Sequence, residues 1–497
     1  MNRRRFLGTA FSAAALGDPK LWPNLPRVCA KEARLPQAWV RFHPDLEPVV
    51  HWIENTPRER ILGEAVHRIR RGLAYRDLLA GLFLAGIRQV QPRPIGFKFH
   101  AVLVVNSAHL ASLESGETDR WHPILWALHR FKLSQEADER EGDWALGAVE
   151  ESKLPPSHLA RSAFIEAMER WDESAADAAI TALARTAGAH EIFDLLCRFG
   201  LRDFREIGHK QIYISNAFRV LDVIGWRHAE PVLRGIVYGL LDTDRDPNPS
   251  KSDLPADRPG RRNRERLKDI PDPWLAGRPN DDTSRRILAA CRDASAIDLG
   301  EIVIQSLRQG SSPASIFDGL HAATAELLLR EPGLVSMHAW TTTNAARYAW
   351  NRVSHDETRR FMLLQNASFI PLFRGQPKKS TVALDQLPVE PLEESGPEAL
   401  HKLFEGPIRQ PGAAIRLHSW LEAGHDPGAF AATARRFLFA KGTDAHDYKF
   451  CSAFLEDYPH IAPRWRNPFL AASILYLRGA QDPDNAVIQQ IREALKS

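Results

Sequence analysis

Cysteine is scarce in this chain of 497 residues, and charge of either sign is not in excess. The four cysteines, Cys29, Cys197, Cys291 and Cys451, stand far apart, with no C-x-x-C pair among them. A zinc ribbon and a disulfide framework are therefore not expected. With 65 Lys+Arg against 62 Asp+Glu, no chain-wide field attracts a phosphate backbone, so we expect no nucleic-acid partner.

Long hydrophobic runs and familiar catalytic motifs are also missing. No stretch reaches 18 consecutive apolar residues, so we expect no stable membrane span. The sequence contains no G-x-x-x-x-G-K-[ST], G-x-G-x-x-G, G-x-S-x-G or H-E-x-x-H, so P-loop, Rossmann, hydrolase-elbow and zincin mechanisms have no local support. What the chain does have is 19 His and 13 Trp, which makes imidazole and indole the functional groups to follow.

The N-terminus begins Met-Asn-Arg-Arg-Arg-Phe-Leu-Gly and resembles a twin-arginine export signal. A short region of small apolar residues follows, Gly8 to Gly17, which is too short to span a bilayer. The resemblance implies the twin-arginine export machinery as a partner, a location on the periplasmic or cell-envelope side, and a protein exported folded, often with its cofactor inserted. The alternative is a plain basic tail.

From about Pro36 the apolar residues recur at helical spacing and strand-like alternation is scarce; Val102 to Val105 is the only β-branched cluster. Thr56-Pro57-Arg58-Glu59 has the pattern of a capping box with proline at the first helical position. We find no fixed repeat period. The sequence therefore predicts an all-α fold, an irregular multi-helix array or orthogonal bundle with long Pro-rich surface linkers.

Composition divides the chain into six parts. The expected parts are an export signal and N-terminal arm (1–30), a first helical block (31–241), a linker (242–282), a second block (283–374), a second linker (375–411) and a C-terminal helical block (412–497). Both linkers are rich in proline and lack apolar periodicity, which is typical of surface connections.

Three histidines begin similar helical stretches. Each is followed about two turns later by a small amide or hydroxyl residue and an alanine: His100 by Ser107-Ala108, His209 by Asn216-Ala217, and His338 by Asn344-Ala345. Residues at i+3, i+4 and i+7 share a helix face, and each histidine begins a face that is otherwise apolar or weakly polar, so the imidazoles should point inward. His109 is half a turn out of phase with His100 and is therefore the weaker candidate.

Two more histidines complete the candidates, His321 and His446, the latter on a face with Lys449. Neutral imidazoles from several helices can ligate a metal or haem iron, or one can act as a general base. The candidate metal ligands are therefore His100, His209, His321, His338 and His446. The candidate catalytic residues are His338, His209 and His100, and Asn344 or Thr341 would orient a bound group. Each histidine has the alternative of a hydrogen-bonded core residue, and the cofactor itself stays unknown.

The stretches His100-Ala101-Val102-Leu103, His122-Pro123-Ile124-Leu125 and His338 to Ala345 resemble the questin oxidase-like family. The resemblance implies an all-helical oxidoreductase with a His-lined pocket that acts on a small apolar or aromatic molecule; the named member of the family performs an oxygen-dependent ring-opening oxidation. The alternative function is a non-catalytic, helical-repeat-like scaffold that binds another protein and has structural histidines.

Overall fold

The computed structural model describes residues 39–117, 119–243, 245–376, 382–392 and 396–496. The export signal and Cys29 lie outside these ranges. Within them the all-α fold is confirmed, because the extended backbone is limited to two isolated bridges, Trp39 with Gly147 and Arg278 with Ser311. None of the described helices is long and apolar enough to cross a membrane.

Up to residue 240, the described part of the chain consists mainly of helices. These helices are α2 (Glu47–Asn55), α3 (Arg58–Arg70), α4 (Tyr75–Gln89), α5 (His100–Leu103), α6 (Val105–Leu113), α7 (His122–Glu141), α8 (Ala160–Arg170), α9 (Glu173–Thr186), α10 (Ala189–Gly200), α11 (His209–Ile224) and α12 (Ala229–Leu240). The capping box at Thr56 is wrong: the Thr56 hydroxyl donates to the Trp52 carbonyl at the end of α2, and Pro57 is the N-cap of α3.

The second half is helical throughout as well. Its helices are α13 (Arg258–Arg266), α14 (Asp281–Asp293), α15 (Ala296–Arg308), α16 (Pro313–Arg330), α17 (Leu334–Arg352), α18 (Asp356–Arg374), α19 (Gly396–Glu405), α20 (Pro411–Glu422), α21 (Pro427–Lys441), α22 (Ala445–Asp457), α23 (Pro463–Ser473) and α24 (Ala486–Lys496). The two expected linkers are thus more ordered than their composition indicated. Each contains a helix, α13 in the first and α19 in the second.

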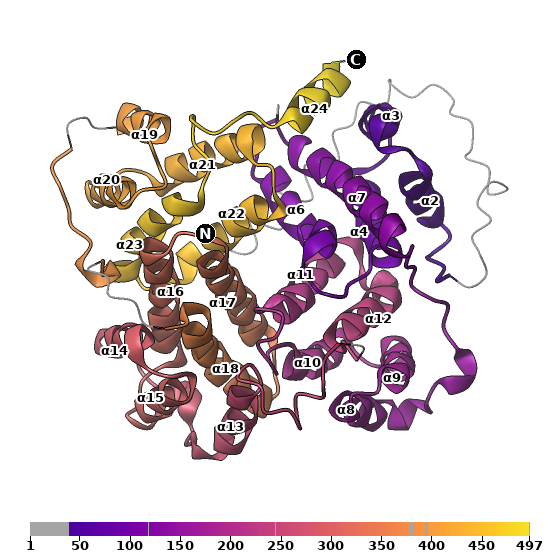
Figure 1. The fold of residues 1–497 in the computed structure, drawn as a ribbon, viewed down its shortest axis with the longest axis horizontal. Helices are drawn as coiled ribbons and strands as arrows, with labels where there is room; N and C mark the ends of the chain where they lie inside the picture. Colours follow the sequence, from indigo (N-terminus) through magenta and orange to yellow (C-terminus); the bar gives the residue numbers. More distant parts are fainter. Residues whose placement is uncertain (1–38, 118, 244, 377–381, 393–395, 497) are drawn as a thin grey trace.

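The C-terminal helix packs against helices from the beginning of the chain. In Figure 1, α24 lies beside α3 and α7, so the last described helix packs on the first ones. Buried apolar side chains form one continuous core from Val40 to Ile491. Helices that are far apart in the sequence therefore share one interior.

Four helical segments enclose the middle of this interior. The pair α5/α6 packs on α11, α11 on α17, α17 on α22, and α22 returns to α5/α6 (Figure 1). The β-branched cluster from Val102 to Val105 is helical, with a break at Val104 between α5 and α6. The histidine-bearing stretches are the members of this ring.

Candidate metal centre

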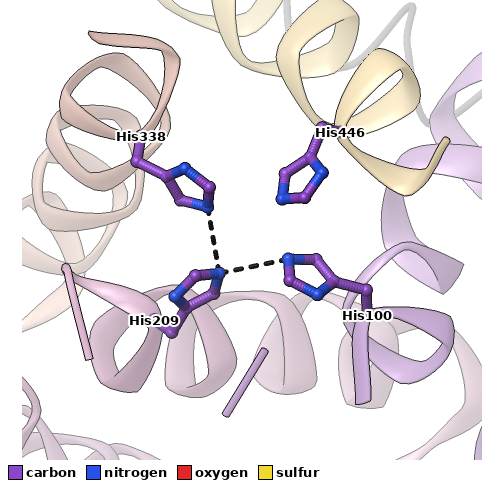
Figure 2. Close-up of side chains that lie close together, drawn as sticks. All are labelled: His100, His209, His338 and His446. Atoms are coloured by element: carbon purple, nitrogen blue, oxygen red, sulfur yellow. Dashed lines mark hydrogen bonds between the residues drawn. The ribbon is translucent and has the colours of Figure 1, made fainter. Parts of the chain in front are cut away.

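Four of the five candidate histidines converge from the four members of the ring. One nitrogen each of His100, His209, His338 and His446 lies within 4.8 Å of the other three, and Figure 2 shows the four rings facing one another. Each histidine is in the first turns of its helix: His100 and His209 begin α5 and α11, His338 is the fifth residue of α17, and His446 is the second of α22. The positive end of a helix dipole disfavours a second proton on such an imidazole.

Burial favours the neutral form of these histidines. His100, His209 and His338 are at most 6% exposed, and burial, reinforced by the charge of Lys449 and of neighbouring histidines, lowers the pKa of each well below the usual value. Burial also lowers the pKa of His446, despite the hydrogen bond to Asp444 that raises it. Neutral imidazole is the form that ligates metals.

Hydrogen bonds to backbone carbonyls fix the tautomer of three rings. The Nδ1 atom of His100 lies 3.1 Å from Phe97 O, that of His209 lies 2.8 Å from Glu206 O, and that of His338 lies 2.8 Å from Leu334 O. A carbonyl oxygen only accepts, so each Nδ1 must hold the proton of its ring. Each Nε2 is therefore a bare lone pair.

These bare nitrogens nevertheless lie close together. His209 Nε2 is 3.1 Å from His100 Nε2 and 3.0 Å from His338 Nε2, the two contacts that are dashed in Figure 2. With no proton on either partner, the contacts cannot be hydrogen bonds, and lone pairs facing each other in a buried site repel. A cation held between the nitrogens would turn this repulsion into attraction.

His446 completes the set in a different way. Its Nδ1 lies 2.5 Å from a carboxylate oxygen of Asp444, the residue that caps α22, while its Nε2 is buried without a hydrogen-bond partner. A carboxylate or carbonyl on the far nitrogen is the usual support of a metal-binding histidine. All four rings thus have an occupied Nδ1 and an Nε2 available to the centre.

The spacing is that of side chains gathered around one point. Two nitrogens bound to one ion at about 2.1 Å lie about 3.0 Å apart at 90° and about 3.4 Å apart at the tetrahedral angle. Two of the observed separations, 3.0 and 3.1 Å, are this short, and the set as a whole lies within 4.8 Å. A haem iron fits poorly, because the porphyrin supplies four of its nitrogens and leaves room for only two imidazoles.

Comparison of the chain with protein-family models, with curated proteins and with solved structures finds no match. The assignment of the site therefore rests on its own geometry, and the resemblance to the questin oxidase-like family remains an expectation from short stretches.

Lys449 lies one turn after His446 on α22, and its charge adds to the effect of burial in lowering the pKa of all four histidines. Its amine is buried, with the side chain 3% exposed and Nζ without a partner. Burial lowers the pKa of Lys449 to about 7. This brings the exchange of a proton at the amine toward neutral pH, which suits Lys449 to accept a proton beside a metal.

The structure does not bring His321 to this centre. Its Nδ1 lies 3.7 Å from Asp457 Oδ2, its ring packs edge-on against Phe469, and burial lowers its pKa to about 3. His109 likewise lies elsewhere, with Nδ1 3.0 Å from the Tyr75 hydroxyl, in agreement with its helical phase. His321 is therefore a residue of the core network rather than a fifth ligand.

The two residues expected to orient a bound group, Thr341 and Asn344, form hydrogen bonds with groups other than the four histidine rings. Thr341 lies one turn after His338 and its hydroxyl approaches the His338 carbonyl at 3.4 Å. Asn344 points to α22, where its amide donates to Glu456 at 2.8 Å and to Asp457 at 2.9 Å. Sequence reasoning missed Asp444 as the support of His446 and Arg219 as a partner of Asn344; the N-cap position of Asp444 was the available signal for the first.

Proposed function

We propose that the protein is a metal-dependent oxidoreductase in which His100, His209, His338 and His446 hold one ion. The observation that carries this proposal is the convergence of proton-free Nε2 atoms in a buried site. Structural histidines need partners for both ring nitrogens, and here the second nitrogens have only one another.

A redox-active ion, iron or copper, suits this donor set. Imidazole binds iron, copper, nickel and zinc, and the resemblance to an oxidoreductase family favours the redox-active members of this group. The Nε2 atoms of the four histidines would hold the ion. When bound, such an ion supplies one-electron chemistry and activation of dioxygen.

The chain's own residues would hold and prepare the site. Carbonyls of residues 97, 206 and 334 and the Asp444 carboxylate orient the four rings, and the buried surroundings exclude bulk water. Lys449, with its pKa lowered to about 7 by burial, would take a proton from an acidic group of the substrate at the centre.

The substrate class and the setting come from the sequence. The resemblance to the questin oxidase-like family favours a small apolar or aromatic substrate and dioxygen as the oxidant. The twin-arginine-like N-terminus favours export to the periplasmic or cell-envelope side with the metal already inserted.

Metal analysis of tag-free protein tests the proposal. We expect about one iron or copper ion per chain in the wild type, loss of the ion in His338→Ala and His209→Ala, and retention in His109→Ala, where a buried histidine outside the centre is removed. Circular dichroism would verify that each variant stays folded. Oxygen uptake with small aromatic compounds would then follow turnover.

A wild-type protein that binds none of iron, copper, nickel or zinc after dialysis against each would refute the metal centre. That outcome would favour the non-catalytic scaffold with structural histidines. Stoichiometric zinc binding without any oxygen uptake would retain the site but exclude the oxidase reaction.

A further inference from the structure

The repeated pattern after each histidine has a structural role that the metal centre does not explain. Two turns beyond the four histidines, each member of the ring carries a small polar residue followed by alanine: Ser107-Ala108, Asn216-Ala217, Asn344-Ala345 and, as a fourth copy in α22, Ser452-Ala453. Ser107 and Asn216 follow their histidines by seven residues, which is about 10 Å along the axis and the same helix face, whereas Asn344 and Ser452 follow by six. Small side chains from all four segments nevertheless line one shaft beyond the histidines.

A small cavity occupies this shaft, which we call the inner cavity. Its walls include Ser107, Asn216 and Asn344 from the second turn, with Thr341 and Lys449 from the turn nearest the histidines. The volume is about 20 Å³, enough for one or two water molecules. The small side chains at these positions are what leave the space open.

Two buried groups of the inner cavity lack partners within the protein. They are Nζ of Lys449 and Nε of Arg219, whose side chains are 3% and 8% exposed. An unpaired buried donor costs about 1–3 kcal/mol, so ordered water in a polar cavity is the expected partner. The inner cavity is thus suited to hold water in contact with the amine beside the histidine centre.

A larger outer cavity of about 140 Å³ adjoins it between α6, α21 and α22. The two cavities share three wall residues, Leu110, Ser452 and Glu456. Glu456 has its side chain 32% exposed. The shared walls therefore place the shaft beside a cavity that has a partly exposed residue in its wall.

Hydrogen bonds across three helices close the junction. Nη2 of Arg219 on α11 lies 2.5 Å from Glu456 Oε2 on α22, and the amide of Asn344 on α17 donates to the same oxygen at 2.8 Å. The Glu456 side chain is partly exposed, whereas Arg219 is buried and also donates to Asn216 Oδ1 at 2.8 Å. Opening of the junction therefore means movement of Glu456 toward solvent, against the attraction of a partly buried ion pair.

We propose that the inner cavity is the entry path by which water and co-substrates of two or three non-hydrogen atoms reach the histidine centre, with the Arg219–Glu456 pair as its gate. A molecule of aromatic size does not fit through 20 Å³ of polar shaft. The path thus separates small co-substrates from the larger substrate. It adds a route to the proposed function, but its test needs neither metal nor turnover.

Reductive methylation of Lys449 in the full-length protein measures the path directly. Formaldehyde has two non-hydrogen atoms; with cyanoborohydride as reductant it methylates a neutral amine, and mass spectrometry of the peptide gives the rate. We expect Lys449 to be methylated in the wild type, at least tenfold more slowly in Ser452→Leu, which fills the junction, and severalfold faster in Glu456→Ala, which removes the gate. A bulky biotin succinimidyl ester should leave Lys449 unmodified in the wild type.

Glu114→Ala is the matched control, because Glu114 also pairs with an arginine, Arg435, beside the outer cavity but does not line the inner one. Its methylation rate should equal that of the wild type. Equal rates in Ser452→Leu and wild type, no methylation of Lys449 in any variant, or equal modification by the bulky ester would each overturn the proposal. Metal content, measured on the same samples, shows separately whether the metal centre holds.

Discussion

Replacing Lys449 with methionine should stabilise the metal-free protein at neutral pH. The Lys449 amine is buried without a hydrogen-bond partner among the described residues, its charge acts on the four histidines, and burial lowers its pKa from 10.5 to about 7. In the unfolded chain the same amine is fully protonated at pH 7 and well solvated. Folding therefore has to remove or bury that charge, and methionine, of similar length, has none to bury.

The size of the effect follows from the two pKa values. At about 1.4 kcal/mol per pH unit of pKa difference, the amine costs roughly 4 kcal/mol at pH 7 and about 1.5 kcal/mol less at pH 8.5. The sign is that of a lysine with a lowered pKa: the unfolded state binds more protons between pH 7 and 10.5, so wild-type stability rises with pH over this window. The variant lacks this rise.

Urea unfolding of chelator-treated protein at pH 7 and pH 8.5 measures both quantities. Lys449→Met should be the more stable protein at pH 7, and its advantage should shrink by about 1.5 kcal/mol at pH 8.5. Lys210→Met is the contrasting control: Lys210 is equally buried, but its Nζ lies 2.8 Å from both carboxylate oxygens of Asp203. Its removal leaves the buried Asp203 carboxylate, among the described residues, with only the Arg205 backbone N–H, at 3.3 Å, as a hydrogen-bond donor, and should cost about 3–5 kcal/mol.

A Lys449→Met variant that is less stable than wild type at pH 7, or an advantage that is the same at both pH values, would refute the reasoning. Either result would mean that the amine has a partner in the folded protein that compensates its burial. The same variant should lose turnover if Lys449 is the base of the proposed reaction.

Three further predictions concern the histidines and their supports. In metal-free protein, the pKa of each of these histidines is lower in the folded state, so the unfolded chain takes up protons first as the pH falls. The free energy of unfolding is therefore highest above about pH 6.5 and falls at lower pH by up to about 1.4 kcal/mol per histidine and pH unit. Thermal unfolding from pH 7.5 to 5 measures this dependence, and a flat profile would contradict it. Asp444→Asn keeps an N-cap but weakens the support of His446, so metal affinity should fall about 10–100-fold; competition with a chelator measures it, and unchanged affinity would remove Asp444 from the site. Gly208→Ala should destabilise the fold by at least about 2 kcal/mol, because Gly208 has φ +84° and its new Cβ would lie 2.0 Å from Thr342 Oγ1; urea unfolding tests it, and near-wild-type stability would show that α17 can move away from α11.

The spacing of apolar residues in the sequence was sufficient to predict the fold class and most of the helices. Apolar spacing and the scarcity of strand signals predicted an all-α fold, which the described residues confirm. Helices α13 and α19 were missed because their proline-rich surroundings lack apolar periodicity, and tertiary contacts supply what the pattern does not. The capping box at Thr56 failed because the hydroxyl bonds to the preceding helix instead.

Helical phase, a local property, was enough to predict that His100, His209 and His338 begin helices and point inward, and that His446 shares a face with Lys449. Which histidines meet depended on how the helices pack. His321 has the same kind of inward face yet lies beside Asp457, while His446, more than 100 residues after His338, completes the centre. The reason is that convergence depends on how α5/α6, α11, α17 and α22 close into a ring, and the period of one helix carries no information about its neighbours.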